Sequence, residues 1–258
     1  MKYEFITVEH DERLTIVTIN RPSAHNALNA AAHEEMQHAF DAFAKDDEQW
    51  LAILTGAGEK AFCAGHDLKQ QASGGGLVTP RGGFGGLTAR FDLTKPIIAA
   101  VNGVAMGGGF ELALACDIVV ASSHTVFALP EGRVGLAPLA GGIQRLPQAI
   151  GLKHSMGMML TGRRVTAAEG RALGFVNEVV EGNVLAAALR WANEILACSP
   201  MSIRAIKEAV LRGLDTPLDK ALKDEWNYPA MEAMLASNDA LEGARAFAEK
   251  RAPRWAGS

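Results

Sequence analysis

The chain has 258 residues, of which 48% are hydrophobic and 21% are charged, a composition typical of a globular protein with one sizeable domain. Lys and Arg number 25 and Asp and Glu 29, so the formal net charge is −4, and no long run of one sign occurs. This charge balance argues against nucleic acid or an anionic membrane as the main partner.

The N-terminal segment is acidic and has no apolar core of the kind found in a secretory signal, so we expect a cytoplasmic protein. Alternating or apolar stretches at 3–8 and 13–19 predict a β-hairpin. Apolar residues at helical spacing predict an amphipathic helix over 29–45. Short apolar runs predict buried strands at 51–58, 97–101 and 117–122, with a helix at 108–115. This succession of short strands and helices indicates an α/β core with parallel strands.

Three features in the first two hundred residues bear on function. The glycine-rich stretch 73–86 predicts a mobile loop, which is either a surface insertion or a lid over a substrate site. The cysteines are odd in number and unclustered, at Cys63, Cys116 and Cys198. This spacing favours reduced, buried thiols. His33 and His38 lie five residues apart, whereas a zinc-binding pair on a helix lies four apart, so we expect no metal.

The last third of the chain is predicted to be helical. Its expected helices span 183–197, 201–213, 216–234 and 238–250. Thr216 and Pro217 are read as the N-cap and first residue of the third helix, and Asn238 or Asp239 as the cap of the fourth. We therefore divide the chain into a core at 1–199 and a helical packing or assembly region at 200–258.

The clearest chemical signal lies where an apolar strand meets an apolar helix. Glycines fill positions 107–109 there, and Glu111 follows two residues later. Glycines at a helix start bring backbone N–H groups close to a ligand, with the positive end of the helix dipole behind them. A second acid, Glu131, follows Pro130 in an apolar stretch. N–H donors beside half-buried acids are the groups needed to stabilise an oxyanion and move a proton.

In this order and spacing, these segments resemble the enoyl-CoA hydratase/isomerase family, the crotonases, over nearly the whole chain. Within the family, the sequence is most similar to bacterial enoyl-CoA hydratases and carnitinyl-CoA dehydratases. The matching stretches include RPSAHNAL (21–28), GEKAFCAGHDLK (58–69), KPIIAAVNGVAMGGGFELALACDI (95–118), FALPEGRVGLAPLAGGIQRLP (127–147), LTGRRVTAAEGRALGFVNEVV (160–180) and AFAEKRAPRW (246–255).

The resemblance implies an α/β fold of the ClpP/crotonase type, a spiral of ββα units with a C-terminal helical trimerisation region. It implies a homotrimer or a hexamer of two trimers. It also implies an acyl-CoA thioester substrate, with no cofactor because coenzyme A is part of the substrate. By the same resemblance, the backbone N–H groups of His66 and Gly108 form an oxyanion hole. Glu111 matches the glutamate that acts on water, and Glu131 the one that supplies the proton to C2.

The same resemblance marks residues that bind the substrate and its CoA portion. These are Ala64, His66, Asp67, Leu68, Lys69, Phe247 and Lys250, the last two approaching the nucleotide in some members from a neighbouring subunit. His66 departs from the family, which usually has a small residue there. Its backbone N–H is retained, and its imidazole is expected to reach the CoA diphosphate, line the acyl entrance or point to solvent.

The implied activity is that of an enoyl-CoA hydratase, a hydro-lyase that reversibly adds water to a 2-enoyl-CoA, as in β-oxidation. The alternatives are a carnitinyl-CoA dehydratase, a Δ3-Δ2-enoyl-CoA isomerase and a non-catalytic acyl-CoA binder. An isomerase needs chiefly one base, and a non-catalytic member would be expected to lose a glutamate or the glycine run. Since Glu111, Glu131 and residues 107–109 are all present, the sequence favours the hydratase.

Overall fold

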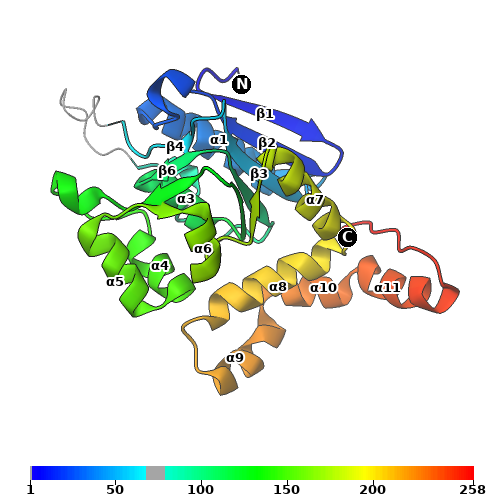
Figure 1. The fold of residues 1–258 in the computed structure, drawn as a ribbon. Helices are drawn as coiled ribbons and strands as arrows, with labels where there is room; N and C mark the ends of the chain where they lie inside the picture. The colour runs from blue at the N-terminus through cyan, green and yellow to red at the C-terminus, as the bar shows by residue number, and fades with distance from the viewer. Residues whose placement is uncertain (1, 68–78) are drawn as a thin grey trace.

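The computed structural model describes residues 2–67 and 79–258 and is built on a large sheet (Figure 1). The strands of this sheet are β1 (Ile6–Asp11), β2 (Leu14–Ile19), β3 (Leu51–Gly56), β5 (Ile97–Val101), β7 (Ile118–Ser122) and β10 (Glu178–Val180). They are hydrogen-bonded in the order β1-β2-β3-β5-β7-β10. Strands β1 and β2 form the predicted antiparallel hairpin, and every other pair is parallel.

A second, smaller sheet lies beside the first. Its strands are β4 (Ala61–Cys63), β6 (Val104–Met106), β8 (Val126–Ala128) and β9 (Val165–Thr166), hydrogen-bonded in that order. Along the chain, β3, β5 and β7 enter the large sheet, and each is followed by a strand of the small sheet. The chain therefore alternates between two sheets in repeated units, which is the geometry of the predicted spiral.

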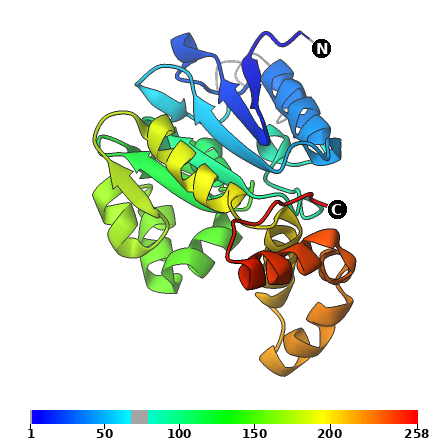
Figure 2. The same cartoon turned by 90° about the vertical axis from the view of Figure 1, so that its right-hand side faces the viewer.

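Helices cover both faces of the large sheet. On one face, α1 (Ala30–Lys45) packs through Met36 and Phe40, and on the other, α7 (Val184–Leu196) packs across β3, β5 and β7 (Figure 2). Ile53 and Leu54 are adjacent in β3 and belong to the clusters on opposite faces. A sheet covered on both faces accounts for the continuous apolar run of β3, all of whose residues are buried.

Further helices and turns complete the core. They are α3 (Gly108–Ala115), α4 (Gly142–Ile150), α5 (Leu152–Thr161), α6 (Ala167–Leu173) and the 3-10 turns η1 (Pro22–Ala24), η2 (Phe84–Gly86) and η3 (Glu131–Val134). Of these, α3 and α6 pack on the small sheet. The predicted helices at 29–45 and 108–115 are confirmed as α1 and α3. Asn29 caps α1, because its side chain accepts the Ala32 N–H at 2.8 Å.

The C-terminal helices form an arm outside the two sheets (Figure 1). They are α8 (Pro200–Gly213), α9 (Leu218–Asp224), η4 (Glu225–Asn227), α10 (Pro229–Ala236) and α11 (Asn238–Glu249). The prediction of one helix over 216–234 is wrong. Tyr228 precedes Pro229 and is extended, with ψ of 138°, so the helix breaks there.

Two predicted helix caps in the arm are also wrong. Thr216 does not cap α9, because its hydroxyl donates to the Arg212 carbonyl at 3.0 Å and Pro217 takes the cap position. Ser237 caps α11, accepting the Ala240 N–H, in place of the predicted Asn238 or Asp239. The carboxylate of Asp239 is instead buried and accepts the Ser199 hydroxyl at 2.9 Å.

Large apolar side chains stand exposed along this arm. They include Ile206, Val210, Leu211, Leu214, Leu218, Leu222, Trp226, Leu235, Leu241 and Phe247. A monomeric protein rarely exposes so many apolar side chains on one part of its surface. The arm therefore carries a surface suited to contact with another chain.

The cysteines are free thiols, of which Cys63 and Cys116 are buried as predicted. The prediction is wrong for Cys198, which is exposed because it follows the last turn of α7 at the surface. Within residues 2–67 and 79–258, no helix is both long enough and apolar enough to cross a bilayer.

Candidate active site

The turn after β4 and the start of α3 are held close together. The Leu28 N–H donates to the Gly65 carbonyl at 2.8 Å, and the Asp67 N–H donates to the Leu28 carbonyl at 2.9 Å, which fixes the turn against residue 28. Gly65 has a φ of +91°, and a Cβ there would lie 2.8 Å from the Met106 carbonyl oxygen and 3.2 Å from the Gly108 nitrogen. Only glycine permits this approach.

This approach brings two unused donors to one place. Across the described residues, the backbone N–H groups of His66 and Gly108 donate to no acceptor. Gly108 is the first residue of α3, so its N–H is among those that a helix leaves unpaired. Both residues line a cavity of about 880 Å³. The pair is suited to hold a negatively charged oxygen.

Glu111 lies one turn into α3 and lines the same cavity. Its side chain is almost fully buried, and Oε1 accepts the N–H groups of Ala140 and Gly142, both at 2.8 Å. Burial first, and then the Glu131 carboxyl, raise the pKa of Glu111, and against the lowering effect of the two N–H groups it comes to about 7. The carboxyl is therefore fixed in place and able to change protonation near neutral pH.

Glu131 reaches the cavity from the small turn η3, directly after Pro130. Its Oε2 atom is buried and has no hydrogen-bond partner within the described parts of the chain. Burial raises the pKa of Glu131, and the N–H of its own backbone opposes this shift. The raised pKa favours a neutral carboxylic acid, the form that can donate a proton.

His66 also contributes its side chain to the cavity wall. Its Nε2 atom is buried, and its ring stacks on that of His33 with centroids 6.0 Å apart. Burial lowers the pKa of His66, and the charge of Asp67 opposes this shift. The imidazole therefore does not point to solvent, which was one of its three expected orientations.

Comparison with known proteins agrees with this geometry. Residues 9–258 match the family model described as enoyl-CoA hydratase/isomerase. The chain belongs to the enoyl-CoA hydratase/isomerase family. Carnitinyl-CoA dehydratase of Salmonella arizonae is 44% identical over 249 residues, which cover 93% of this chain and 94% of that protein. The enzyme of that name from Proteus mirabilis is 42% identical over the same shares of the two chains.

Solved structures with the same fold include family members from other bacteria. The enoyl-CoA hydratase of Mycobacterium tuberculosis superposes with a TM-score of 0.92 at 41% identity, covering 98% of this chain and 99% of that one. The enoyl-CoA hydratase of Bacillus anthracis gives a TM-score of 0.89 at 35% identity, covering 99% of this chain and all of that one. The predicted crotonase-type fold is thereby confirmed. The chain is an enzyme of this family, and the two relatives named above are dehydratases by name.

The structure brings five of the ten expected site residues to the wall of one cavity. Ala64 lines it together with His66, Gly108 and the two glutamates. Asp67 lies beside the cavity, where its carboxylate pairs with Arg21 at 3.0 Å. Two further expected residues, Leu68 and Lys69, lie outside the described residues, as does part of the predicted loop at 73–86.

Phe247 and Lys250 are not brought to the cavity within one chain. Both are exposed at the end of α11, far from α3 (Figure 1). Lys250 has a φ of +53° and forms the left-handed C-cap of that helix. A role for these two residues therefore requires the cavity of a neighbouring subunit, and it stays a prediction.

Several residues of the cavity wall are not predicted by the sequence pattern. Phe84 lines the cavity, and so do Arg133, Arg163 and Arg164. Phe84 stands between two pairs of glycines in the sequence, and this pattern predicts a loop but no place in a site. The Cys63 thiol, near the same turn, is buried, and its pKa is raised to about 12, so it is no nucleophile.

Proposed function

We propose that this enzyme adds water reversibly to a 2-trans-enoyl-CoA and forms the 3-hydroxyacyl-CoA. The observation that carries the proposal is a single cavity holding two unpaired backbone N–H groups and two carboxyl groups with raised pKa values, of which Glu111 is buried and Glu131 half-buried. These are the groups that hydration of a conjugated thioester requires.

The N–H groups of His66 and Gly108 act on the thioester oxygen. When water attacks C3, negative charge moves through the double bond onto that oxygen. Two donors aimed at it stabilise this enolate-like state more than the neutral thioester, so they accelerate the reaction rather than only binding substrate. Loss of one such donor typically costs about 10²–10³ in rate.

The two glutamates divide the proton transfers. Glu111 takes a proton from water as the oxygen bonds to C3, and its Oε1 is already occupied by the N–H groups of Ala140 and Gly142, which leaves Oε2 for the water. Glu131 gives a proton to C2 and resolves the enolate. A pKa near 7 suits Glu111 to this exchange at neutral pH.

A carnitinyl-CoA dehydratase is the second candidate, favoured by the identity of 44% to a protein of that name. That reaction is the same chemistry on an acyl chain with a trimethylammonium group. An aromatic ring stabilises such a cation, and Phe84 is a cavity residue of this kind. An isomerase that shifts the double bond needs chiefly one base, and a non-catalytic binder needs neither glutamate.

We further propose that the enzyme works as a homotrimer or hexamer in the cytoplasm. The exposed apolar side chains of α8 to α11 support an assembly surface. In such an assembly, Phe247 and Lys250 of one subunit approach the CoA nucleotide bound by another. The coenzyme A arrives with the substrate, and no separate cofactor is invoked.

A panel of acyl-CoA substrates tests these proposals. Crotonyl-CoA, a longer 2-enoyl-CoA and crotonobetainyl-CoA are offered, and loss of the conjugated-thioester absorbance is followed. A hydratase turns over the first two, whereas a preference of about 10²-fold or more in kcat/KM for crotonobetainyl-CoA assigns the second candidate. No turnover of any substrate, despite binding, would contradict both.

A further inference from the structure

His33 is a buried titratable residue that takes no part in the proposed hydration steps. It lies on α1 and is completely buried. Its Nδ1 accepts the Gly85 N–H at 3.0 Å, and since a backbone N–H can only donate, the ring proton lies on Nε2. Burial, followed by the charge of His66, lowers the pKa of His33 to about 4, so the ring is neutral near pH 7.

The His33 ring contacts two aromatic rings near the unpaired N–H groups, those of Phe84 and His66. On one side, it meets the edge of Phe84 with centroids 4.6 Å apart and planes at 85°. The Phe84 ring in turn covers Gly108 so closely that a Cβ there would lie 2.5 Å from Cζ. On the other side, the ring stacks on His66. The His33 imidazole thus contacts the side chain of one donor residue, His66, and the Phe84 ring that covers the other, Gly108.

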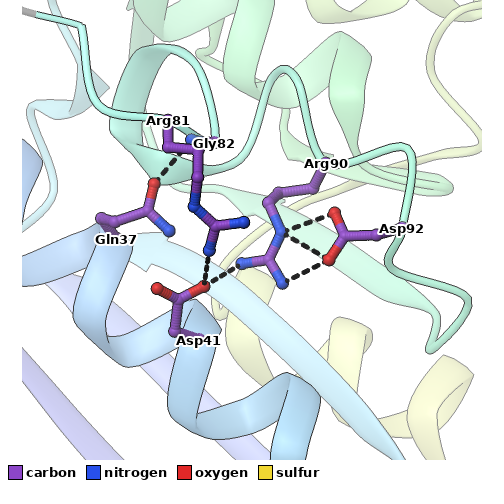
Figure 3. A network of polar contacts seen from close by, with 6 residues as sticks. All are labelled: Gln37, Asp41, Arg81, Gly82, Arg90 and Asp92. Carbon is purple, nitrogen blue, oxygen red and sulfur yellow. Dashed lines mark hydrogen bonds and ion pairs between the residues drawn. The ribbon is translucent and has the colours of Figure 1, made fainter.

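Two more residues on the same face of α1 hold the segment that carries Phe84. Gln37 and Asp41 follow His33 at intervals of four residues, so the three form one stripe. Gln37 Oε1 accepts the Gly82 N–H at 2.6 Å (Figure 3). Asp41 Oδ1 pairs with the guanidinium groups of Arg90 at 2.9 Å and Arg81 at 3.2 Å. This polar stripe fixes residues 81–92 against α1.

We propose that His33, assisted by Gln37 and Asp41, is a positioning residue that holds Phe84 and His66 around the oxyanion hole. The inference rests on the proposed function, because it assumes that the His66 and Gly108 N–H groups bind the thioester oxygen. Removing the acceptor at position 33 releases Gly85, lets Phe84 move off Gly108 and removes the ring behind His66. Misplacement of a catalytic group by about 1 Å can cost about 10²-fold in rate.

The test compares two ligands that differ at the thioester oxygen. Butyryl-CoA presents a neutral thioester, whereas acetoacetyl-CoA can bind as an enolate with negative charge on oxygen. We expect His33→Leu to weaken acetoacetyl-CoA binding about 10-fold and to reduce enolate absorbance, with butyryl-CoA affinity changed less than about 3-fold. His33→Asn should recover most of this loss, because its Oδ1 can accept the Gly85 N–H.

The control is His38→Leu on the same helix, where His38 is exposed and its ring bonds to the Tyr3 hydroxyl at the surface. This variant should bind both ligands as the unaltered enzyme does. If His33→Leu does not fold, Gln37→Leu, which leaves the cavity wall intact, should show the same selective loss at a smaller size. Equal weakening of both ligands, or no rescue by His33→Asn, overturns the inference alone. Failure of the unaltered protein to bind either ligand overturns the proposed function as well.

Discussion

The site region and the C-terminal arm depart from the usual distribution of polar and apolar side chains in opposite directions. Around α3, a carboxyl and an imidazole are buried, in Glu111 and His33, and each is held by backbone N–H groups. Along the arm, apolar side chains such as Leu222 and Trp226 are exposed. The first departure costs stability, which catalysis can require, and the second is unfavourable unless another chain covers the apolar side chains. The catalytic groups around α3 are therefore assembled within one chain, whereas the apolar surface of the arm needs a second chain to cover it.

The largest expected effect is on catalysis in the site region. Glu111→Gln and Glu131→Gln should each lower kcat by about 10²–10⁴, because each removes one proton transfer. Hydration of crotonyl-CoA measures this, with Glu34→Gln as the control, since Glu34 is exposed on α1. If Glu111→Gln keeps its full rate while Glu131→Gln is inactive, Glu111 is not the base for water. That result would favour the isomerase alternative, which needs chiefly one base.

A second expected effect is on stability, where Glu111 should cost free energy at alkaline pH. Its pKa in the folded chain is about 7, above the ordinary 4.5, so its contribution to stability is complete below pH 4.5 and is lost as the pH rises through 7. Glutamine keeps the acceptor for Ala140 and Gly142 without a charge. Glu111→Gln should therefore raise the unfolding free energy by up to about 3 kcal/mol at pH 8 and by little at pH 4.5.

Urea unfolding at both pH values, at one protein concentration, measures this difference. An equal gain at both pH values would show that the carboxylate charge is not the cause. A gain confined to pH 8 would show that the ionised carboxylate of Glu111, which activity requires, lowers the unfolding free energy.

The smallest expected effect on a single chain is in the arm. Replacing Leu222 and Trp226 together by serine removes exposed side chains, so the helical circular dichroism of the chain should be unchanged and its stability should shift by about 0.5 kcal/mol or less. The assembled size by light scattering should fall, because an apolar contact surface is lost. A full-sized oligomer in this variant would contradict the assembly role of the arm.

The sequence predicted the elements whose pattern is local. Strands β1 and β2 alternate, α1 has apolar residues at helical spacing and an Asn cap, and α3 begins at a glycine run, so each was placed within a few residues. Strands β6 and β8 have three residues each, which is too short for an alternating pattern that would predict a strand. The break at Tyr228 was missed because a single residue before proline decides it.

The site was predictable only in part for the same reason. The two glutamates and the glycine run stood out as acids and bare backbone in apolar surroundings. The place of Phe84 depends on hydrogen bonds that the Gly82 and Gly85 N–H groups donate to side chains of α1, a segment far away in sequence. The orientation of the His66 ring likewise depends on His33. Local pattern cannot encode contacts of this kind.

In the proposed mechanism, Glu111 is the base for water and ionises near pH 7. The pH dependence of kcat/KM for hydration of crotonyl-CoA tests it most directly, because this quantity reports groups of the free enzyme. We predict that kcat/KM falls about tenfold per pH unit below a pKa near 7, and that this limb disappears from the residual activity of Glu111→Gln. A rate that stays constant from pH 5 to pH 8 in the unaltered enzyme would contradict the account.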